Sequence, residues 1–244
     1  EGLDEAYINT SDSYENNGII EEAKTNASLN WGNKIATARW NWLINPKLFS
    51  NLTASSSRYR FLTDLGLEQS RTELGTTTKE SFQLSYLSQI EDMGIKWDFD
   101  YRPSPNHSIK FCSGLTRHQF EPGVNSIVMN LGGAGTLDTS FGSFPQTAMD
   151  YVAYVQDDWK LGDRLRINMG LHLNGFNVGE SNYLSLQPRL SARYLLNEKS
   201  SIKWSYVEMT QYMHLLANQT IGLPTDLWVP VTENILPQEA WQTA

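Results

Sequence analysis

The sequence predicts an all-β protein built from long antiparallel strands whose two faces meet different media. The clearest evidence is the segment 95–102, in which large apolar residues hold the odd positions and charged residues the even ones. Successive side chains of a strand point to opposite sides of a sheet, so one face of this strand requires an apolar environment and the other requires water. The alternation recurs over 165–174 and 202–206, which indicates a repeated two-faced hairpin.

Composition excludes one fold class but does not decide whether the strands lie in a membrane or in water. The chain has 40% hydrophobic residues and a mean hydropathy of -0.43, and no run approaches the roughly 20 apolar residues that a spanning helix needs. A helical membrane protein is therefore excluded. Transmembrane β-barrels escape hydropathy scans because half of each strand faces a polar lumen, so the hairpins fit either such a barrel or a soluble sandwich.

Charge and cysteine content exclude one class of partner. A net charge of -8 argues against a nucleic-acid partner, whose phosphates call for a basic patch. The single cysteine, Cys112, allows no internal disulfide. The chain begins at Glu1 without a leader and ends in what reads as the start of a strand, so we expect a piece of a longer protein.

Turn signals of two kinds favour the barrel. Short Pro, Gly or Asn turns occur at 45–47, 103–106, 161–163 and 197–199, and longer polar connections are expected at 1–27, 121–148, 177–182 and 213–237. The two kinds alternate along the chain. Outer-membrane barrels place short turns on the periplasmic side and long loops outside, whereas a sandwich has no reason to sort its loops by end.

The expected strands are long. They cover 28–44, 48–62, 79–102, 108–120, 149–160, 164–176, 183–196 and 201–212, with another opening near 238. Several exceed the usual soluble strand of about 5 to 6 residues and reach the roughly 9 to 11 that a bilayer requires. Within 79–102 the apolar face moves from even to odd positions, and we interpret this change as a bulge at 92–94.

Aromatic residues gather beside the short turns, as expected for a membrane-interface girdle. The alternative is that these rings pack the ends of a sandwich core. The residues assigned to the girdle are Trp40, Trp42, Trp97, Phe99, Tyr101, Trp159, Tyr194 and Trp204.

Catalytic and metal chemistry find little support. Asp157 and Asp158 are neighbours on a strand, so they point to opposite faces and cannot share a proton or a metal. The four histidines and Cys112 lack tight metal-ligand spacing, and no serine lies in a nucleophile-elbow setting. We predict no enzyme activity, no cofactor and no metal.

Binding residues are predicted in the long connections. Aromatic and imidazole rings among Asn, Gln and Thr suit stacking and directional hydrogen bonding to a ligand, although they could equally pack the loops together. The ligand-binding candidates are Tyr183, Tyr212, His214 and Trp228. Charged residues on the watery face, such as Lys96, Asp98, Asp100, Arg166 and Lys203, are interpreted as solvated wall or plug contacts.

Three segments carry a resemblance to a known family. The strand, turn and strand 151–171, which begins Tyr-Val-Ala-Tyr-Val-Gln-Asp-Asp-Trp, resembles a unit recurrent in TonB-dependent outer-membrane receptors. The segment 187–194 resembles their next strand. The stretch from 209–216 to 222–230 resembles a loop of the branch that carries a carboxypeptidase-regulatory-like domain ahead of the plug.

The resemblance implies part of a plugged barrel of the 22-stranded type, in which about eight strands make roughly a third of the wall. Residues 1–244 would form part of one barrel domain in the outer membrane of a Gram-negative bacterium, lacking the plug, the N-terminal extension and the C-terminal strands. The implied function is ligand-gated, energy-coupled nutrient import. The implied partners are outer-membrane lipid, the plug of the parent chain and an inner-membrane energy-transducing protein. A surface lipoprotein that acts as a lid is a further candidate partner. A soluble carbohydrate-binding sandwich and a small outer-membrane barrel enzyme are the alternatives.

Overall fold

The computed structural model describes residues 2–142, 144–218 and 225–244, and it consists mainly of one antiparallel sheet. The order along the sheet is β1-β2-β3-β4-β5-β7-β8-β9-β10-β13, with β6 also pairing with β5. The strands are β1 (Gly2–Asn16), β2 (Ile19–Asn45), β3 (Leu48–Glu73), β4 (Thr76–Ser104), β5 (His107–Asn130), β6 (Thr136–Gly142), β7 (Gln146–Leu161), β8 (Leu165–Val178), β9 (Ser181–Asn197), β10 (Ser200–Gln211) and β13 (Gln238–Thr243).

Two smaller elements complete the described chain. Strands β11 (Met213–Asn218) and β12 (Thr225–Pro230) form a separate two-stranded sheet, and a 3₁₀ turn, η1 (Gly132–Ala134), joins β5 to β6. None of the described residues belongs to a helix of the length and apolarity that crossing a bilayer would require.

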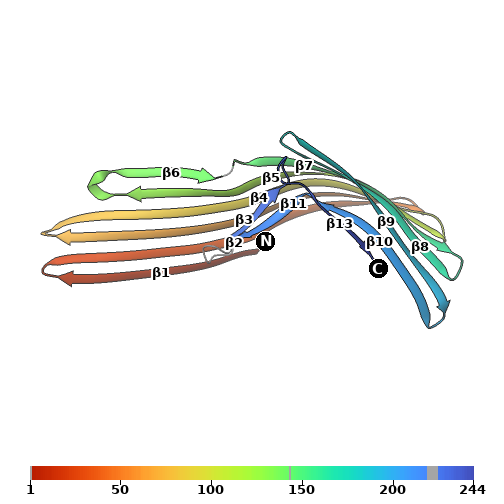
Figure 1. Cartoon of the computed structure of the whole chain (residues 1–244), viewed down its shortest axis with the longest axis horizontal. Helices are drawn as coiled ribbons and strands as arrows, with labels where there is room; N and C mark the ends of the chain where they lie inside the picture. Colours follow the sequence, from red (N-terminus) through yellow and green to blue (C-terminus); the bar gives the residue numbers. More distant parts are fainter. Residues whose placement is uncertain (1, 143, 219–224) are drawn as a thin grey trace.

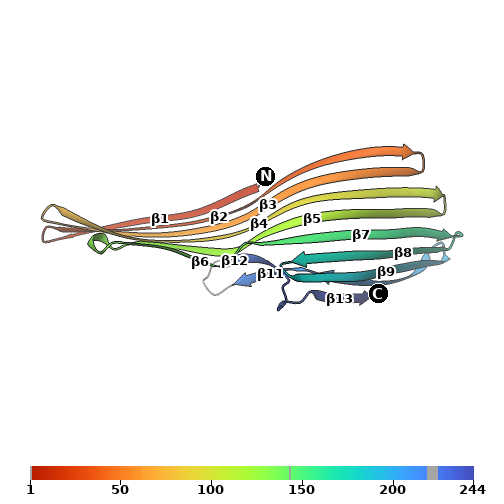
Figure 2. The same cartoon turned by 90° about the horizontal axis from the view of Figure 1, so that it is seen from above.

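The large sheet is curved and open (Figures 1 and 2). Consecutive strands are neighbours, as in an up-and-down barrel wall, but the described strands do not close on themselves. The four predicted short turns lie together at one end, shown on the right of Figure 2. Strands β1 to β5 run on past the opposite ends of β7 to β10, and they form a projecting part of the sheet together with β6.

This projection consists of residues 2–31, 61–90 and 120–142 and is called the extension below. The sequence-based expectation of long loops at 1–27 and 121–148 is wrong, because β1 and β2 occupy most of the first segment and β5 and β6 most of the second. Asn17 and Gly18 turn β1 into β2 with φ of 52° and 77°. Positive φ at both central residues is the geometry of a type I′ hairpin turn, for which Asn-Gly is the strongest short-range signal.

Each expected strand has a counterpart in the structure. Strands β2, β3 and β5 continue 9 to 11 residues beyond their predicted ranges into the extension, whereas the others end within about three residues of the predicted bounds. The expected long connection at 177–182 is wrong, because β8 runs to Val178 and β9 begins at Ser181, which leaves a two-residue turn. The expected connection 213–237 contains β11 and β12. A sandwich is not formed, because the described strands make one continuous wall and no second large sheet packs on it.

Register assigns every strand residue to a face, because directly opposed residues point to the same side. We call inner the face that carries Phe120 and Phe176, since these buried rings pack with Tyr212 and Val231 of the inward-folded segment. In the half nearer the short turns the other, outer face is apolar. It carries Trp97, Phe111, Val155, Leu171 and Leu190, which lie on five successive strands.

The predicted bulge at Asp92–Gly94 is wrong. Strand β4 pairs with β3 without a break from Glu73 opposite Thr76 to Leu48 opposite Tyr101. The extra residue lies instead in β5, where Leu87 faces Val124 but Gln89 faces Glu121. The parity of β4 is therefore constant, and Phe82, Leu84 and Tyr86 lie on the inner face while Ile95, Trp97 and Phe99 lie on the outer face.

The change of apolar face has a physical explanation in the surroundings of the strand. On the outer face, Arg58 donates to Gln89 at 3.0 and 2.7 Å and pairs with Glu91 at 3.0 Å, and apolar residues begin immediately below at Met93. From Met93 to Tyr101 β4 spans about 9 residues, the length that crosses a bilayer. Above Glu91 the outer face is polar and the inner face takes the apolar residues.

A bulge residue offers a test of this register. Gly123 has a φ of 72°, and a Cβ added there would lie 2.9 Å from the Tyr86 ring. We expect Gly123→Ala to destabilise the local strand pairing by about 1 to 2 kcal/mol, the cost of a left-handed backbone for a residue with a side chain. Hydrogen exchange over 118–130 should quicken, whereas Gly133→Ala, which has open space around it, should leave exchange unchanged. Equal exchange in both variants would contradict the register.

Candidate functional site

The strongest candidate site is the inner face beneath the β11–β12 hairpin. Strand β12 contacts β4 and β5 of the large sheet, so the segment after β10 folds back over the wall. A buried cluster forms where they meet. It contains Phe120, Ala148, Phe176, Val178, Tyr212 and Val231, with Ile90, Tyr183, Met213 and Trp228 packed against it.

Tyr212 anchors this segment to the wall. Its ring stacks on Phe176 with a centroid distance of 5.1 Å and an interplanar angle of 2°. Its hydroxyl donates to Ser185 Oγ at 2.8 Å and approaches the Asn174 carbonyl at 3.4 Å. Burial raises the pKa of this hydroxyl above its usual value, so it remains a neutral donor at physiological pH.

Backbone contacts close the base of the segment. The Val231 amide donates to the Tyr212 carbonyl at 2.9 Å. The Tyr183 hydroxyl donates to the Thr232 carbonyl at 2.7 Å, which ties β9 to the residues that follow β12. The described residues of this segment, 213–218 and 225–230, therefore form a strap that is held against the inner face beside Tyr212 and Val231.

The four predicted ligand-binding residues all lie at this strap. The Tyr183 and Tyr212 ring centroids are 6.3 Å apart, and Trp228 packs against the same cluster. His214 on β11 is 8% exposed, and its Nε2 is buried without a hydrogen-bond partner among the described residues. The structure thus brings together residues that are far apart in sequence, while their contact with a ligand stays a prediction. Residues 222–224 of the resembling loop lie outside the described residues.

Sequence reasoning missed the polar floor of the site. Asp92 accepts from Ser57 Oγ at 3.2 Å and lies 2.7 Å from His118 Nδ1, and His118 is only 5% exposed. Beside them Asn174 donates to Asp150 at 2.6 Å. The available signal was the alternation of faces, because all of these residues occupy inner-face positions of strands whose outer face is apolar nearer the short turns.

Below this floor the inner face stays polar down to the short turns. Lys96 Nζ pairs with Asp98 at 2.9 Å, and the Tyr154 hydroxyl donates to the same carboxylate at 3.2 Å. Lys203 opposes Arg193 on this face. The predicted lumen residues thus lie on one continuous hydrophilic wall.

The adjacent carboxylates 157 and 158 diverge as expected. Asp158 faces inward and pairs with Arg166, whereas Asp157 faces outward and lies 2.6 Å from His107 Nδ1. No group of three or more His, Cys, Asp and Glu residues in the described part of the chain could hold a metal ion.

The predicted interface aromatics all lie on the outer face, close to the short turns. The Trp97 and Phe99 ring centroids lie 5.0 Å apart with the ring planes tilted by 38°, and Trp97 donates its indole proton to Ser50 Oγ at 2.7 Å. Trp40 and Trp42 lie parallel with centroids 6.2 Å apart. Register assigns the same face to the others of the set, which are Tyr101, Trp159, Tyr194 and Trp204.

Comparison with known proteins identifies the family. Residues 2–214 match the family described as TonB dependent receptor-like, beta-barrel. The chain belongs to this family, and it is part of the β-barrel of a TonB-dependent receptor of the outer membrane. No curated protein matches the chain.

The solved structures to which the chain is similar are distant from it in sequence. The siderophore receptor PirA from Pseudomonas aeruginosa is 15% identical with a TM-score of 0.44, over 98% of this chain and 48% of that one. PirA from Acinetobacter baumannii is 11% identical with a TM-score of 0.46, over 99% and 47%. The copper transporter OprC is 9% identical with a TM-score of 0.40, over 86% and 46%. The chain spans about half the length of these neighbours, which are receptors and transporters.

Two substitutions separate the forces that hold the strap. Tyr212→Phe keeps the stack on Phe176 but removes the hydroxyl bonds, so we expect it to weaken docking by about 0.5 to 1.5 kcal/mol. Tyr212→Ala also removes the ring and should cost about 3 to 5 kcal/mol. Hydrogen exchange of 213–218 in the whole receptor measures docking. Equal protection in the wild type and the alanine variant would contradict the role of Tyr212 as anchor.

Proposed function

We propose that this part of the barrel serves energy-coupled import of a nutrient that its extracellular segments and lumen bind. The observation that carries the proposal is the strap above a hydrophilic inner wall, in a sheet whose outer face is apolar at the height of that wall. Such a wall gives a ligand a watery path, while the strap narrows the entrance from the side of the extension. Membership in the receptor family supports the same reading.

The residues at the strap fit the role of first contact with the nutrient. Tyr183 and Trp228 are only partly buried, so they offer ring faces for stacking, while the buried Tyr212 holds the strap in place. The floor residues Asp92, His118 and Asp150 would then meet a ligand that passes the strap. In this function the nutrient is moved without any covalent bond in it being made or broken.

The proposal includes partners that lie outside this chain. The parent protein would supply a plug domain within the lumen, and an inner-membrane energy-transducing protein would act on that plug. A surface lipoprotein lid remains a further candidate partner at the extracellular side. Outer-membrane lipid would surround the apolar outer face, with the eight aromatics near the short turns at the periplasmic interface.

Lipid contact at the outer face predicts a strong asymmetry between faces. Leu171 lies in the middle of the apolar band of β8, and Asn168 lies on the inner face of the same strand. We expect Leu171→Lys to lower the free energy of unfolding of the bilayer-inserted receptor by about 2 to 4 kcal/mol, because it buries a charge near the membrane centre. Asn168→Lys should change it little. Urea titration of the full receptor in lipid vesicles measures both, and equal effects would contradict the assignment of faces.

Uptake by cells tests the function itself. A strain without the parent gene is compared with a complemented strain on ferric siderophores, oligosaccharides, peptides or cobalamin as the limiting nutrient. We expect loss of growth on one class, restored by the wild-type gene and abolished by an uncoupler of the proton gradient. Growth of both strains on every class, or uptake that resists the uncoupler, would overturn the proposal.

The same cells test the site. Tyr183→Ala with Trp228→Ala should raise the nutrient concentration that gives half-maximal uptake by about tenfold, because stacking contacts are lost. Trp241→Ala is the matched control, since Trp241 is a 72% exposed aromatic on the outer face of β13. An equal effect of both changes would remove the strap from the ligand site.

A further inference from the structure

The inner face of the extension is an exposed apolar surface that the described chain leaves uncovered. Two adjacent rows of side chains cross it from β1 to β6. The first row contains Ile8, Ala27, Leu65, Leu84 and Ile127, and the second contains Leu67, Phe82, Met129 and Leu137. Ile8 is 65% exposed and Leu137 49% exposed. The described part of the strap packs at the base of the extension, where its buried cluster involves Ile90 and Phe120.

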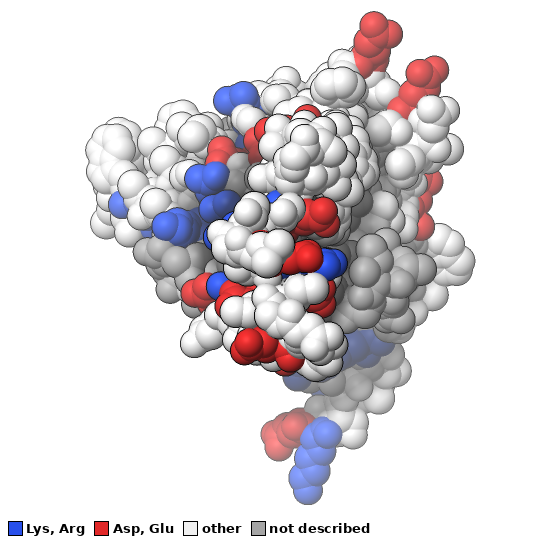
Figure 3. Space-filling model, turned by 90° about the vertical axis from the view of Figure 1, so that its left-hand side faces the viewer, with Lys and Arg blue, Asp and Glu red and all other residues white. Residues whose placement is uncertain are grey.

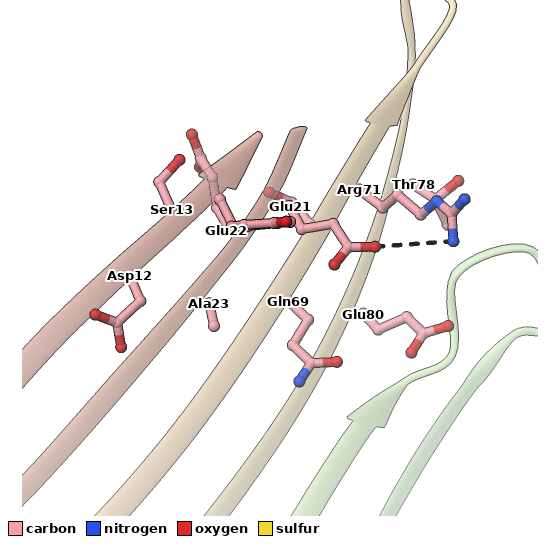
Figure 4. Close-up of a pocket in the computed structure, with 11 residues that line it drawn as sticks. Asp12, Ser13, Glu21, Glu22, Ala23, Gln69, Arg71, Thr78 and Glu80 are labelled. Carbon is pink, nitrogen blue, oxygen red and sulfur yellow. Dashed lines mark ion pairs between the residues drawn. The ribbon is translucent and has the colours of Figure 1, made fainter. Parts of the chain in front are cut away.

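An acidic hollow borders the apolar rows on the side of the hairpin tips. Its volume is about 520 Å³, and the inner-face residues Asp12, Glu21, Gln69, Arg71 and Glu80 contribute to its lining. Figure 4 shows these side chains projecting from β1 to β4. Arg71 pairs with Glu21 at 3.8 Å and with Glu73 at 3.1 Å, so its single positive charge is shared between two carboxylates. Asp12 and Glu80 add further negative charge beside them.

Charge is distributed unevenly between the extension and the rest of the wall. The extension holds twelve Asp and Glu residues against three Lys and Arg residues, whereas the whole chain has a net charge of -8. The remainder is therefore close to neutral. Figure 3 looks onto the tips, where acidic side chains gather between uncharged ones. An anionic field of this kind attracts and orients cationic partners before contact.

The combination of an apolar surface and negative charge selects among occupants. A second copy of the chain would bring a second acidic extension into contact, which is unfavourable because like charges repel. Nucleic acid and anionic lipid headgroups are disfavoured for the same reason. A cationic segment with apolar side chains would neutralise the hollow and cover the adjoining rows at once.

We propose that the inner face of the extension is a docking surface for a cationic, partly apolar polypeptide segment, with its basic residues in the hollow and its apolar residues on the two rows. The orientation of the extension toward the cell exterior rests on the proposed function. The docking itself needs neither energy coupling nor import. This surface lies outside the strap site described above. It is a second site on the same chain, and its ligand or partner is a polypeptide.

Binding of a model peptide to the full-length receptor tests this surface. The probe is a fluorescent peptide of about 12 alternating Lys and Leu residues, which spans roughly 40 Å when extended. The receptor is held in zwitterionic lipid nanodiscs, empty nanodiscs are subtracted, and anisotropy gives the dissociation constant. We expect binding that weakens at least tenfold between about 50 mM and about 300 mM salt, as screening shortens the reach of the charges. A Glu-Leu peptide and a Lys-Ser peptide should each bind at least tenfold more weakly.

Paired variants locate the binding on the inner face. The triple change Asp12→Asn, Glu21→Gln and Glu80→Gln removes three inner-face charges. The matched change Glu5→Gln, Glu15→Gln and Asp138→Asn removes three outer-face charges of the extension, on β1 and β6. Ile8→Ser with Leu67→Ser is matched by Tyr7→Ser with Val128→Ser on the outer face. The inner variants should weaken binding about tenfold and the outer variants less than twofold.

The outcomes distinguish this proposal from the proposed function. Equal effects of inner and outer variants, equal binding of the Glu-Leu peptide, or no binding because other segments of the parent chain cover the surface would each overturn the docking surface. None of these results would contradict the proposed nutrient import, which is tested separately by uptake in cells. Conversely, a receptor that fails the uptake test but binds the Lys-Leu peptide on its inner face would retain the docking surface. Wild-type amide exchange patterns in every variant exclude misfolding as the cause of lost binding.

Discussion

The constraint on which the rest of this structure depends is the strict alternation of side chains along an unbroken strand. A strand that pairs on both sides satisfies its backbone hydrogen bonds at any height, in lipid or in water. Its faces, however, cannot exchange without an extra residue. Strand β4 passes from the band at Met93–Tyr101 into the extension without such a residue on its β3 side. The residue types have to change sides where the medium changes, and they do so near Ile90.

This exchange of residue types gives the wall three levels. Near the short turns the outer face is apolar and aromatic, and the inner face carries ion pairs such as Lys96 with Asp98. Around Asp92 and His118 the inner face holds buried polar groups beneath the strap. In the extension the inner face becomes apolar and the outer face polar, as where Asp64 accepts from Ser85 at 2.5 Å. Each level therefore offers a different surface to anything moving along the inside.

The strap shows how a small amount of tertiary contact organises the entrance. Burial of Tyr212 on Phe176 excludes water from its hydroxyl, and that hydroxyl then requires the partners that Ser185 and Asn174 provide. Packing and hydrogen bonding thus depend on each other at one residue. Because the contacts come from β8, β9 and the segment after β10, the position of the strap depends on the curvature of the wall.

The sequence by itself determined the strands outside the extension, their two-faced character and the end at which the short turns gather. It did so because alternation and turn chemistry are local properties, readable in Ile95–Arg102 or in Leu161–Asp163. It also brought Tyr183, Tyr212, His214 and Trp228 into one set, although by composition alone. The Asn17-Gly18 dipeptide is a hairpin-turn signal in the extension. The strands on either side of it are polar and lack the strong alternation that would have predicted them.

Only the tertiary structure decided which face is inner and how far each residue lies from the end of the sheet that holds the short turns. The change of parity in β4 reads equally well as a bulge or as a change of medium until the register with β3 is known. The pairing of Asp92 with His118, 26 positions apart, depends on the same register. Cross-strand neighbours are set by hydrogen bonding between segments that are distant in the chain. A local sequence pattern does not specify which residues of two such segments lie opposite each other.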